Sequence, residues 1–233
     1  MPLVVFLVPG RIGVVRRGDM VFQVAELEGG KWKPRWMAHT GIAERTVEDF
    51  YLHQAAMVIH MGSHISRDVW SGGVTEEDVR VDACGSYPGM DDLTRDDIID
   101  EARAYYEIDP SIFQRQSIRS CYWMGDPLPS GHPLFPRAHE IYGFSCSTFA
   151  HYCYSKIIGQ LVNISAMPLV TDVERLELEG IVGRNRVQSD PFRRLYPSYL
   201  MCAFRDDSYP FSPDNWEEHK SHGVFIPSED AAA

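Results

Sequence analysis

One cysteine stands at the start of a helical pattern, and this position constrains the fold more than any other feature of the sequence. Ser145 is a favourable N-cap and Gly159 a favourable stop, so a helix is predicted between them. Apolar residues recur at helical spacing on one side of that helix, at Cys146, Phe149, Ala150, Cys153 and Ile157. A thiol in the first turn lies beside backbone N–H groups that lack partners within the helix, and these groups favour a thiolate.

Two histidines occupy strand-like runs and are candidates for serving this thiol. Side chains alternate in residues 36–43, where His39 shares its face with small residues such as Gly41. Small neighbours leave room for a helix end to approach the imidazole. A second alternating run, residues 56–61, contains His60. If the two runs pair as neighbouring strands, His60 can orient His39, and an imidazole so placed can act as base for a cysteine nucleophile.

The remaining patterns predict an α+β chain. Thr94 and Asp97 resemble a capping box that opens a helix. Gly29-Gly30 is typical of a hairpin turn, whereas residues 169–182 fit either a helix or a strand. Strands are expected at residues 2–8, 19–27, 36–43, 56–61, 78–82 and 199–204.

Length and composition predict one main domain. With 233 residues and 44% hydrophobic content, the chain can bury a substantial core. We expect that domain over residues 1–165 and a C-terminal extension over residues 166–233 that packs on it. Within the domain, residues 107–141 form a proline-containing stretch that would suit an insertion, serving as a lid or a substrate-binding loop.

Charge and cysteine content limit the partners and the compartment. The chain has 33 acidic and 22 basic residues and a net charge of −11, which argues against nucleic-acid binding and against broad attraction to anionic membranes, while peripheral membrane contact stays open. The five cysteines form no CxxC pair and their number is odd, which fits a reducing, cytoplasmic compartment. The apolar run at residues 2–9 is too short to span a bilayer, so no transmembrane segment is expected.

Histidines and arginines in the sequence also raise the alternatives of a zinc site and an anion-binding site. His60 and His64 have an H-x3-H spacing with His53 nearby, but Gly62 interrupts the segment. We therefore expect no metal, and we expect no cofactor. A solvated face or pairing with carboxylates is a simpler interpretation than phosphate or lipid-headgroup binding for the arginines Arg184, Arg186, Arg193 and Arg194.

Several motifs together resemble the lecithin retinol acyltransferase-like (LRAT-like) family, which belongs to the circularly permuted NlpC-like papain-fold thiol enzymes. The similar segments lie between residues 15 and 160 and follow the order of the family. They are Gly18-Asp19-Met20-Val21-Phe22, His39-Thr40-Gly41-Ile42, Val58-Ile59-His60-Met61, the strand and helix segments 79–82 and 93–102, and Ser145-Cys146-Ser147-Thr148-Phe149.

The resemblance implies a permuted papain-like fold, in which an antiparallel sheet packs against the helix that carries the nucleophile. It makes Cys146 the nucleophile, His39 the general base and His60 the polar residue that orients the base. The implied reaction forms an acyl-thioester from an acyl-containing small molecule or lipid, in an acyltransferase or a phospholipase-like hydrolase. Residues 146–149, Cys-Ser-x-Phe, are closer to NlpC-like peptidases. An amidase or cysteine peptidase is therefore an alternative, as is a non-catalytic binding module that retains the fold.

Overall fold

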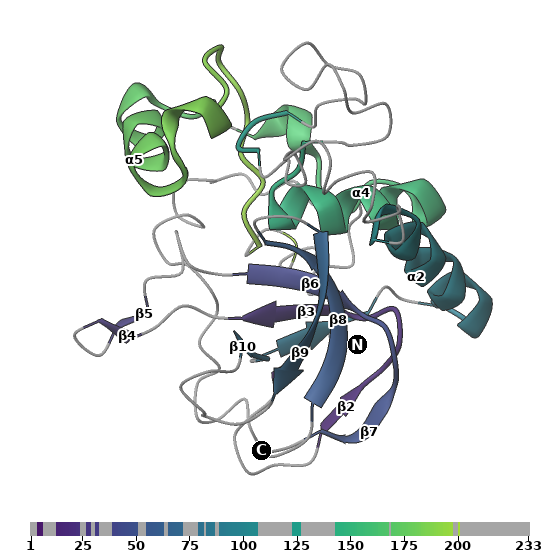
Figure 1. Cartoon of the computed structure of the whole chain (residues 1–233). Coiled ribbons are helices and arrows are strands. Elements are labelled where there is room, and N and C mark those ends of the chain that lie inside the picture. Colours follow the sequence, from purple (N-terminus) through teal and green to yellow (C-terminus); the bar gives the residue numbers. More distant parts are fainter. Residues whose placement is uncertain are drawn as a thin grey trace, which may run out of the picture.

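A seven-stranded sheet forms the centre of the molecule (Figure 1). The computed structural model describes residues 4–6, 13–23, 27–28, 31–32, 39–50, 55–62, 65–71, 79–81, 83–86, 89–106, 123–126, 143–167, 169–197 and 200. The strands lie in the order β1 (Val4–Phe6), β11 (Ala83–Gly85), β3 (Met20–Gln23), β6 (His39–Ala43), β8 (Ala55–Met61), β9 (Ile65–Ser71) and β10 (Val79–Arg80). Neighbouring strands are antiparallel, except for the parallel pair β9 and β10.

The register of the central strands decides which residues share a face. Gly41 of β6 lies opposite Val21 of β3 and opposite His60 of β8. A Cβ atom on Gly41 would come within 2.4 Å of Val58 Cγ1 and 2.8 Å of His60 Cβ, so only glycine fits between these strands. The space over Gly41, which we expected a helix end to use, is therefore filled by β8.

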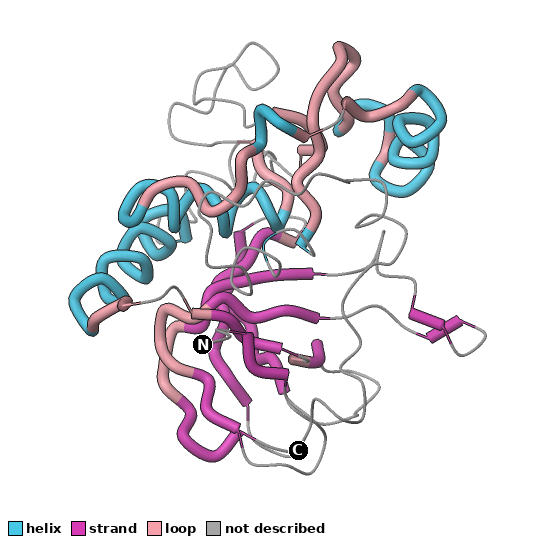
Figure 2. The backbone as a smooth tube through the Cα atoms, turned by 180° about the vertical axis from the view of Figure 1, so that it is seen from behind, coloured by secondary structure: helices cyan, strands magenta, loops and turns pink. Residues whose placement is uncertain are grey.

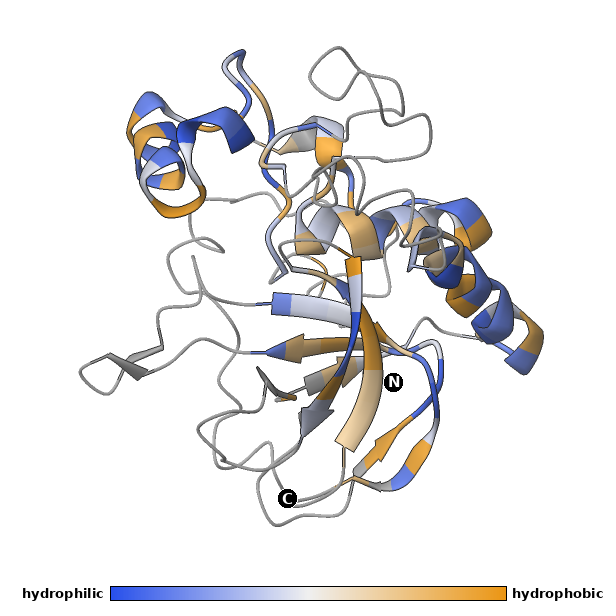
Figure 3. Ribbon diagram, in the orientation of Figure 1, coloured by the Kyte–Doolittle hydropathy of each residue, from blue (hydrophilic) through white to orange (hydrophobic). Residues whose placement is uncertain are grey.

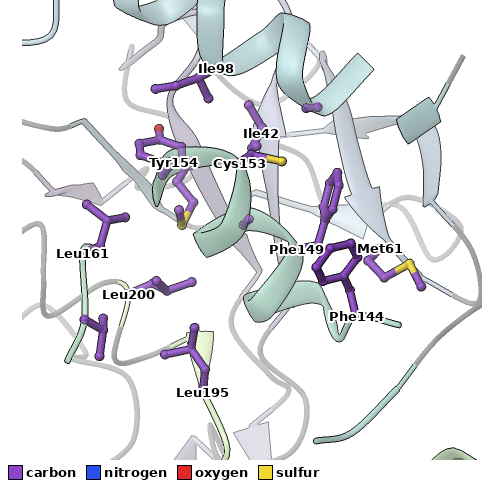
Figure 4. Packing of buried hydrophobic residues seen from close by; sticks show 14 of the residues in the cluster. Ile42, Met61, Ile98, Phe144, Phe149, Cys153, Tyr154, Leu161, Leu195 and Leu200 are labelled. Atoms are coloured by element: carbon purple, nitrogen blue, oxygen red, sulfur yellow. The ribbon is translucent and has the colours of Figure 1, made fainter. Parts of the chain in front are cut away.

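Two helices cover one face of the sheet and form the main core with it. α2 (Asp92–Tyr106) and α4 (Cys146–Ile158) pack against each other and against β6 and β8. Fully buried side chains from the strands and from both helices meet there, among them Ile42, Ile98, Phe149 and Cys153 (Figure 4). Burying one large apolar side chain contributes about 1.5–3 kcal/mol, so this cluster holds α4 firmly against the strands.

The opposite face of the sheet has a buried cluster of its own. Val58 and Trp70 are fully buried in it. Val15 and Phe50 join them from β2 (Gly13–Val15) and β7 (Val47–Phe50), which form a separate antiparallel ribbon. Both Figure 1 and Figure 2 show the helices α2 and α4 on one side of the strands and this ribbon on the other. The central strands are thus buried on both faces.

A buried ion pair joins the start of β3 to α2. Gly18 has a φ of 75°, and a Cβ atom there would lie 3.0 Å from Arg95 Cα. The guanidinium of Arg95 donates to Asp19 Oδ1 at 2.6 Å, and the Ser86 hydroxyl donates to the same oxygen. Tyr154 of α4 donates its hydroxyl to the Gly18 carbonyl. The Gly-Asp sequence is therefore the point at which β3, α2 and α4 are tied together.

A smaller helical unit follows α4. It contains α5 (Asp172–Val182) and η2 (Arg184–Arg186), and its buried cluster consists of Met124, Leu178, Val187 and Phe192; η1 (Ile164–Ala166), which precedes it, packs through Ile164 against the main core. Further along the chain, Leu195, Tyr196 and Leu200 are buried in the main core beside α4. Hydrophilic and hydrophobic residues alternate around α2 and α5 (Figure 3). None of the described helices combines the length and the apolar composition needed to cross a bilayer.

Several predicted elements are confirmed. The molecule is α+β, and α4 runs from Cys146 to the residue before Gly159, as its cap and stop signals predicted. The ambiguous segment near residue 170 is the helix α5. Strands β4 (Leu27–Glu28) and β5 (Lys31–Trp32) pair on either side of Gly29-Gly30.

Other predictions about the elements are wrong or lie outside the described residues. α2 begins at Asp92, because Asp91 and not Thr94 is the cap: its carboxylate accepts the Thr94 N–H at 2.8 Å. Leu200, expected in a strand, is helical and follows Pro197, which suits the first turn of a helix. Strands β2, β5, β7, β9 and β11 overlap none of the expected strands. The segments 107–122 and 127–141 of the expected insertion lie outside the described residues.

Candidate active site

The candidate nucleophile lies in the first turn of α4, where local capping fixes its position. Ser145 Oγ accepts the Thr148 N–H at 3.3 Å, and Thr148 Oγ1 accepts the Ser145 N–H at 2.8 Å. This reciprocal capping holds Cys146 as the first residue of the helix. Cys146 is only 7% exposed, and its sulfur lies 3.8 Å from the Ser147 hydroxyl.

Burial decides the charge of this thiol. It raises the pKa of Cys146 above its ordinary value, and it outweighs the hydrogen bonds from Ser147 and from the Thr40 backbone and the charge of Arg194, which lower the pKa. The expectation that the helix N-terminus would hold a thiolate is therefore wrong for the free protein, because the sulfur has been removed from water. At neutral pH the site contains a neutral thiol, which must lose its proton during any reaction.

The two candidate histidines are in direct contact. His39 at the start of β6 and His60 in β8 are on adjacent antiparallel strands. His39 Nε2 lies 2.8 Å from His60 Nδ1, and the two rings meet edge to face at 88° with their centroids 4.9 Å apart. The side chains meet because His39, Gly41 and His60 project from the same face of the sheet, with glycine between the strands.

The hydrogen bonds continue from His60 to β9. His60 Nε2 lies 2.8 Å from Asp68 Oδ2 and 3.0 Å from Ser66 Oγ, and the Ser66 hydroxyl donates to Asp68 Oδ2 at 2.8 Å. The Asp68 side chain is 54% exposed, so this carboxylate lies at the solvent end of the chain of hydrogen bonds. Neither Asp68 nor Ser66 was expected in the site. Residues 65–71 do not alternate regularly between polar and apolar side chains, so this segment carries no clear strand signal in the sequence.

Trp70 forms an apolar wall against both histidines. Its ring centroid lies 5.3 Å from that of His39 and 5.0 Å from that of His60, and Trp70 itself is fully buried. Burial lowers the pKa of His39 to about 4, although the negative charge of Asp68 raises it in part. His39 is therefore a neutral imidazole at pH 7 and is able to accept a proton.

The Cys146 thiol and the His39 imidazole both lie at the start of β6, and none of the described hydrogen bonds joins them. The thiol lies near the backbone of Thr40, the residue after His39, and this backbone lowers the pKa of the thiol in part. Successive side chains of a strand point to opposite faces, so Thr40 lies on the α4 side with Ile42, and His39 lies on the Trp70 side. Among the described contacts, none joins Cys146 directly to His39. α4 thus approaches the start of β6 from one face of the sheet, and the His39 side chain projects from the other face.

Other histidines and a metal site have less support. His151 is buried in α4, where its Nε2 accepts the Val162 N–H at 3.4 Å. Both ring nitrogens of His60 are hydrogen-bonded within the protein. In the part of the chain that the structure describes, no three His, Cys, Asp or Glu side chains form a group able to hold a metal ion. His53 and His64 of the H-x3-H alternative lie outside that part.

The four arginines of the possible anion site have different environments. Arg193 donates to the Met167 carbonyl, and the Arg184 side chain is 88% exposed, 3.9 Å from Glu179. Arg194 lies over the ring of Tyr196, with its Cζ 4.2 Å from the ring centroid, and its charge acts on the Cys146 thiol. Arg194 is therefore the member of this group that is connected to the candidate site.

These groups are of the kinds that acyl transfer requires. A cysteine in the first turn of a helix supplies a nucleophile, and the backbone N–H groups beside it can stabilise an oxyanion. A neutral imidazole on β6, held by two further side chains, can take and return a proton. Comparisons of the chain with models of protein families, with curated proteins and with solved structures found no match.

Proposed function

We propose that this chain is a Cys–His thiol enzyme that forms an acyl-thioester on Cys146 and acts on lipid acyl groups, as an acyltransferase or a phospholipase-like acyl hydrolase. The observation that carries the proposal is the hydrogen-bonded pair of His39 and His60 at the strand whose Thr40 backbone contacts the thiol. Two neutral groups of this kind, a thiol and an imidazole, are what general-base activation of a cysteine requires.

A permuted papain-like fold is part of the same proposal. It is supported by the mainly antiparallel sheet, by the packing of α4 against β6 and β8, and by the order of the strands that carry the two histidines before the cysteine helix. We assign residues 1–165 to the enzyme domain and residues 166–233 to an extension packed on it. Support for the extension comes from Leu195, Tyr196 and Leu200, which share the main core with α4.

The reaction would proceed in two halves. Cys146 Sγ attacks the acyl carbonyl carbon while its proton passes to His39 Nδ1, the ring nitrogen that does not face His60. N–H groups in the first turn of α4 stabilise the oxyanion; the bond to the leaving alcohol or amine then breaks, and His39 returns the proton to that group. Water, an alcohol or an amine next attacks the thioester and gives its proton to His39; the bond between the acyl carbon and Cys146 Sγ then breaks, and His39 returns the proton to the sulfur. The thiol and imidazole must approach when substrate binds, as catalytic hydrogen bonds of free enzymes often do.

The lipid substrate is proposed from the resemblance of the His39, His60 and Cys146 segments to LRAT-like proteins. Intact mass spectrometry tests it after brief exposure to an activated acyl ester and, separately, to a short-chain phosphatidylcholine. We expect one acyl adduct per chain with either donor, mapped to the Cys146 peptide and absent from Cys146→Ala. Cys153→Ala is the matched control, because Cys153 is a buried free thiol of the same helix. An adduct that persists in Cys146→Ala would refute the assignment of the nucleophile.

A non-catalytic binding module is the second candidate function. It is favoured by the burial of Cys146 and by the raised pKa of its thiol. A binding module predicts no adduct with either acyl donor and no turnover of a peptide amide. Turnover of the amide alone, with a thioester on Cys146, would instead support the amidase or cysteine peptidase alternative.

A further inference from the structure

Asp68 lies at the end of the hydrogen bonds that begin at His39. In the antiparallel pair of β8 and β9, Ser66 is opposite His60 and Asp68 is opposite Val58. Because side chains alternate along a strand, Ser66, Asp68 and His60 project from one face of the sheet. Asp68 Oδ2 lies 2.8 Å from His60 Nε2 and also accepts the Ser66 hydroxyl at 2.8 Å. The Ser66 hydrogen bond therefore holds the carboxylate in place against the imidazole.

The donor and acceptor at each step follow from the carboxylate. An ionised carboxylate can only accept hydrogen bonds, so His60 Nε2 must carry a proton and donate it to Asp68. When His60 is neutral with its proton on Nε2, its Nδ1 is bare and can only accept. In that state His39 Nε2, 2.8 Å from that atom, carries a proton and donates it, whereas a doubly protonated His60 would donate to His39 Nε2 instead. With His60 neutral, the one remaining ring nitrogen, His39 Nδ1, is bare and is the atom that can accept a proton.

Asp68 also places a negative charge near His39. His39 lies against Trp70, and burial disfavours its charged form. The negative charge of Asp68 favours that charged form, across His60. When His39 takes a proton it becomes a cation, which the carboxylate at the end of the hydrogen bonds stabilises without moving.

We propose that Asp68 is a positioning residue of the candidate active site, which acts through His60 to fix the proton of His39 on Nε2 and to leave Nδ1 as the basic atom. The proposal deepens, and for its reaction rests on, the proposed thiol acyl chemistry. The placement of the protons can be measured without that chemistry.

Three substitutions separate the hydrogen bond that Asp68 accepts from His60 from the negative charge that Asp68 supplies. Asp68→Asn keeps an oxygen that can accept from His60 but removes the charge, whereas Asp68→Ala removes both. Asp68→Glu restores the carboxylate and tests rescue by the conservative variant. Asp100→Ala is the matched control, because Asp100 is another exposed aspartate, with a side chain 72% exposed and paired with Arg103 3.4 Å away.

Nuclear magnetic resonance gives the readout that a merely structural role would not change. Long-range 1H–15N correlation spectra distinguish the tautomers of each imidazole. For the wild-type protein at pH 7 we expect both His39 and His60 to be protonated on Nε2. Asp68→Asn keeps these tautomers, whereas in Asp68→Ala the proton of His60 is no longer confined to Nε2 and His39 shows a mixture. Unchanged tautomers in Asp68→Ala would overturn the proposal.

Single-turnover acylation by an activated acyl ester, followed from pH 5 to pH 9, supplies the second readout. We expect acylation to slow about tenfold in Asp68→Asn and about a hundredfold in Asp68→Ala, in line with other carboxylates that orient a histidine, with little change in the apparent affinity for the ester. If ionisation of the Cys146 thiol becomes rate-limiting in Asp68→Asn, this variant should also reach half of its maximal acylation rate constant at a higher pH than the wild-type protein. Full activity of Asp68→Ala would contradict the proposal, even if its tautomers changed.

The two readouts distinguish failure of this inference from failure of the proposed function. One outcome is a wild-type protein that forms no thioester although its histidine tautomers depend on Asp68. This outcome would refute the proposed thiol chemistry and the catalytic role of Asp68. It would still support the placement of the proton on His39 Nε2. The other outcome is a wild-type protein that is acylated at Cys146, but whose histidine tautomers and acylation rate do not change when Asp68 is substituted. This outcome would refute the inference about Asp68 alone.

Discussion

The thiol and the histidine pair are held by different kinds of contact. Cys146 depends mainly on its neighbours in the sequence, because Ser145 and Thr148 cap the turn in which it lies. His39 depends on side chains from two other strands, His60 of β8 and Asp68 of β9. A slip of one residue between β6 and β8 would turn His60 to the opposite face and break this arrangement. The position of the candidate nucleophile is therefore a local property, whereas the orientation of the candidate base is a property of the whole sheet.

Removing the base should produce the largest effect. His39→Gln keeps a group that can hydrogen-bond to His60 but cannot accept the thiol proton, so we expect acylation to slow about 10²- to 10⁴-fold, equivalent to about 3–5 kcal/mol in the barrier. Single-turnover mass spectrometry measures this rate. His151→Gln changes a histidine buried in α4, which accepts the Val162 N–H, and should leave acylation intact. Equal losses in the two variants would show that the histidine pair has no special role.

Acid should weaken the fold through two histidines, His39 and His151, whose pKa values are lowered by burial. Burial lowers the pKa of His39 and of His151 to about 4, so between about pH 6.5 and pH 4 the unfolded chain binds more protons than the folded one. The free energy of unfolding must therefore fall as the pH falls through that window, by roughly 3 kcal/mol for each imidazole. Urea unfolding at several pH values measures it. His39→Gln and His151→Gln should each remove one share of the pH dependence, and an unchanged slope would contradict the burial of that histidine.

The close approach of β6 and β8 can be broken at Gly41. A methyl group there meets Val58 and His60 at 2.4 and 2.8 Å, so Gly41→Ala should lower the free energy of unfolding by about 1–3 kcal/mol and slow acylation by moving His60. Chemical denaturation measures the first effect. Gly180→Ala is the control: nothing lies within 4 Å of the new Cβ, and a helical alanine should stabilise the protein by about 0.5–1 kcal/mol. Destabilisation by both substitutions would refute the close-packing argument.

Removing the helix cap next to Cys146 should produce the smallest effect. Ser145→Ala removes the cap of α4 and should cost about 1 kcal/mol of stability, together with some acylation rate, because the first turn that carries Cys146 then frays. Thr171→Ala removes the same kind of capping box from α5. It should cost a similar amount of stability with no effect on acylation. Equal acylation in the two variants would mean that the cap does not position the thiol.

The same difference explains which parts of the site could be predicted from the sequence. Ser145 and Gly159 mark the ends of α4 because capping depends on neighbouring residues. The pairing of the histidine strands could be proposed from alternation, because both runs place a histidine at a regular position. Asp68 could not be identified, since its role depends on the register of β9, a strand that was not expected.

The charge of the thiol was predicted wrongly for a related reason. The helix N-terminus and its N–H groups are visible in the sequence around Ser145, and they favour a thiolate. The opposing effect, burial of Cys146, comes from tertiary packing at β6 and is the larger one. Local patterns thus identified the thiol, whereas its protonation state required the packed structure.

The contact between Tyr154 and the Gly18 carbonyl has a consequence for the order in which the molecule is assembled. Strands β3, β6, β8 and β9 follow one another early in the chain, so the histidines and Asp68 can meet while a ribosome is still synthesising the remainder. Tyr154 must close a loop of 136 residues to reach Gly18, and α4 docks with it. The growing chain therefore contains the two histidines and Asp68 before the candidate nucleophile Cys146 has been synthesised.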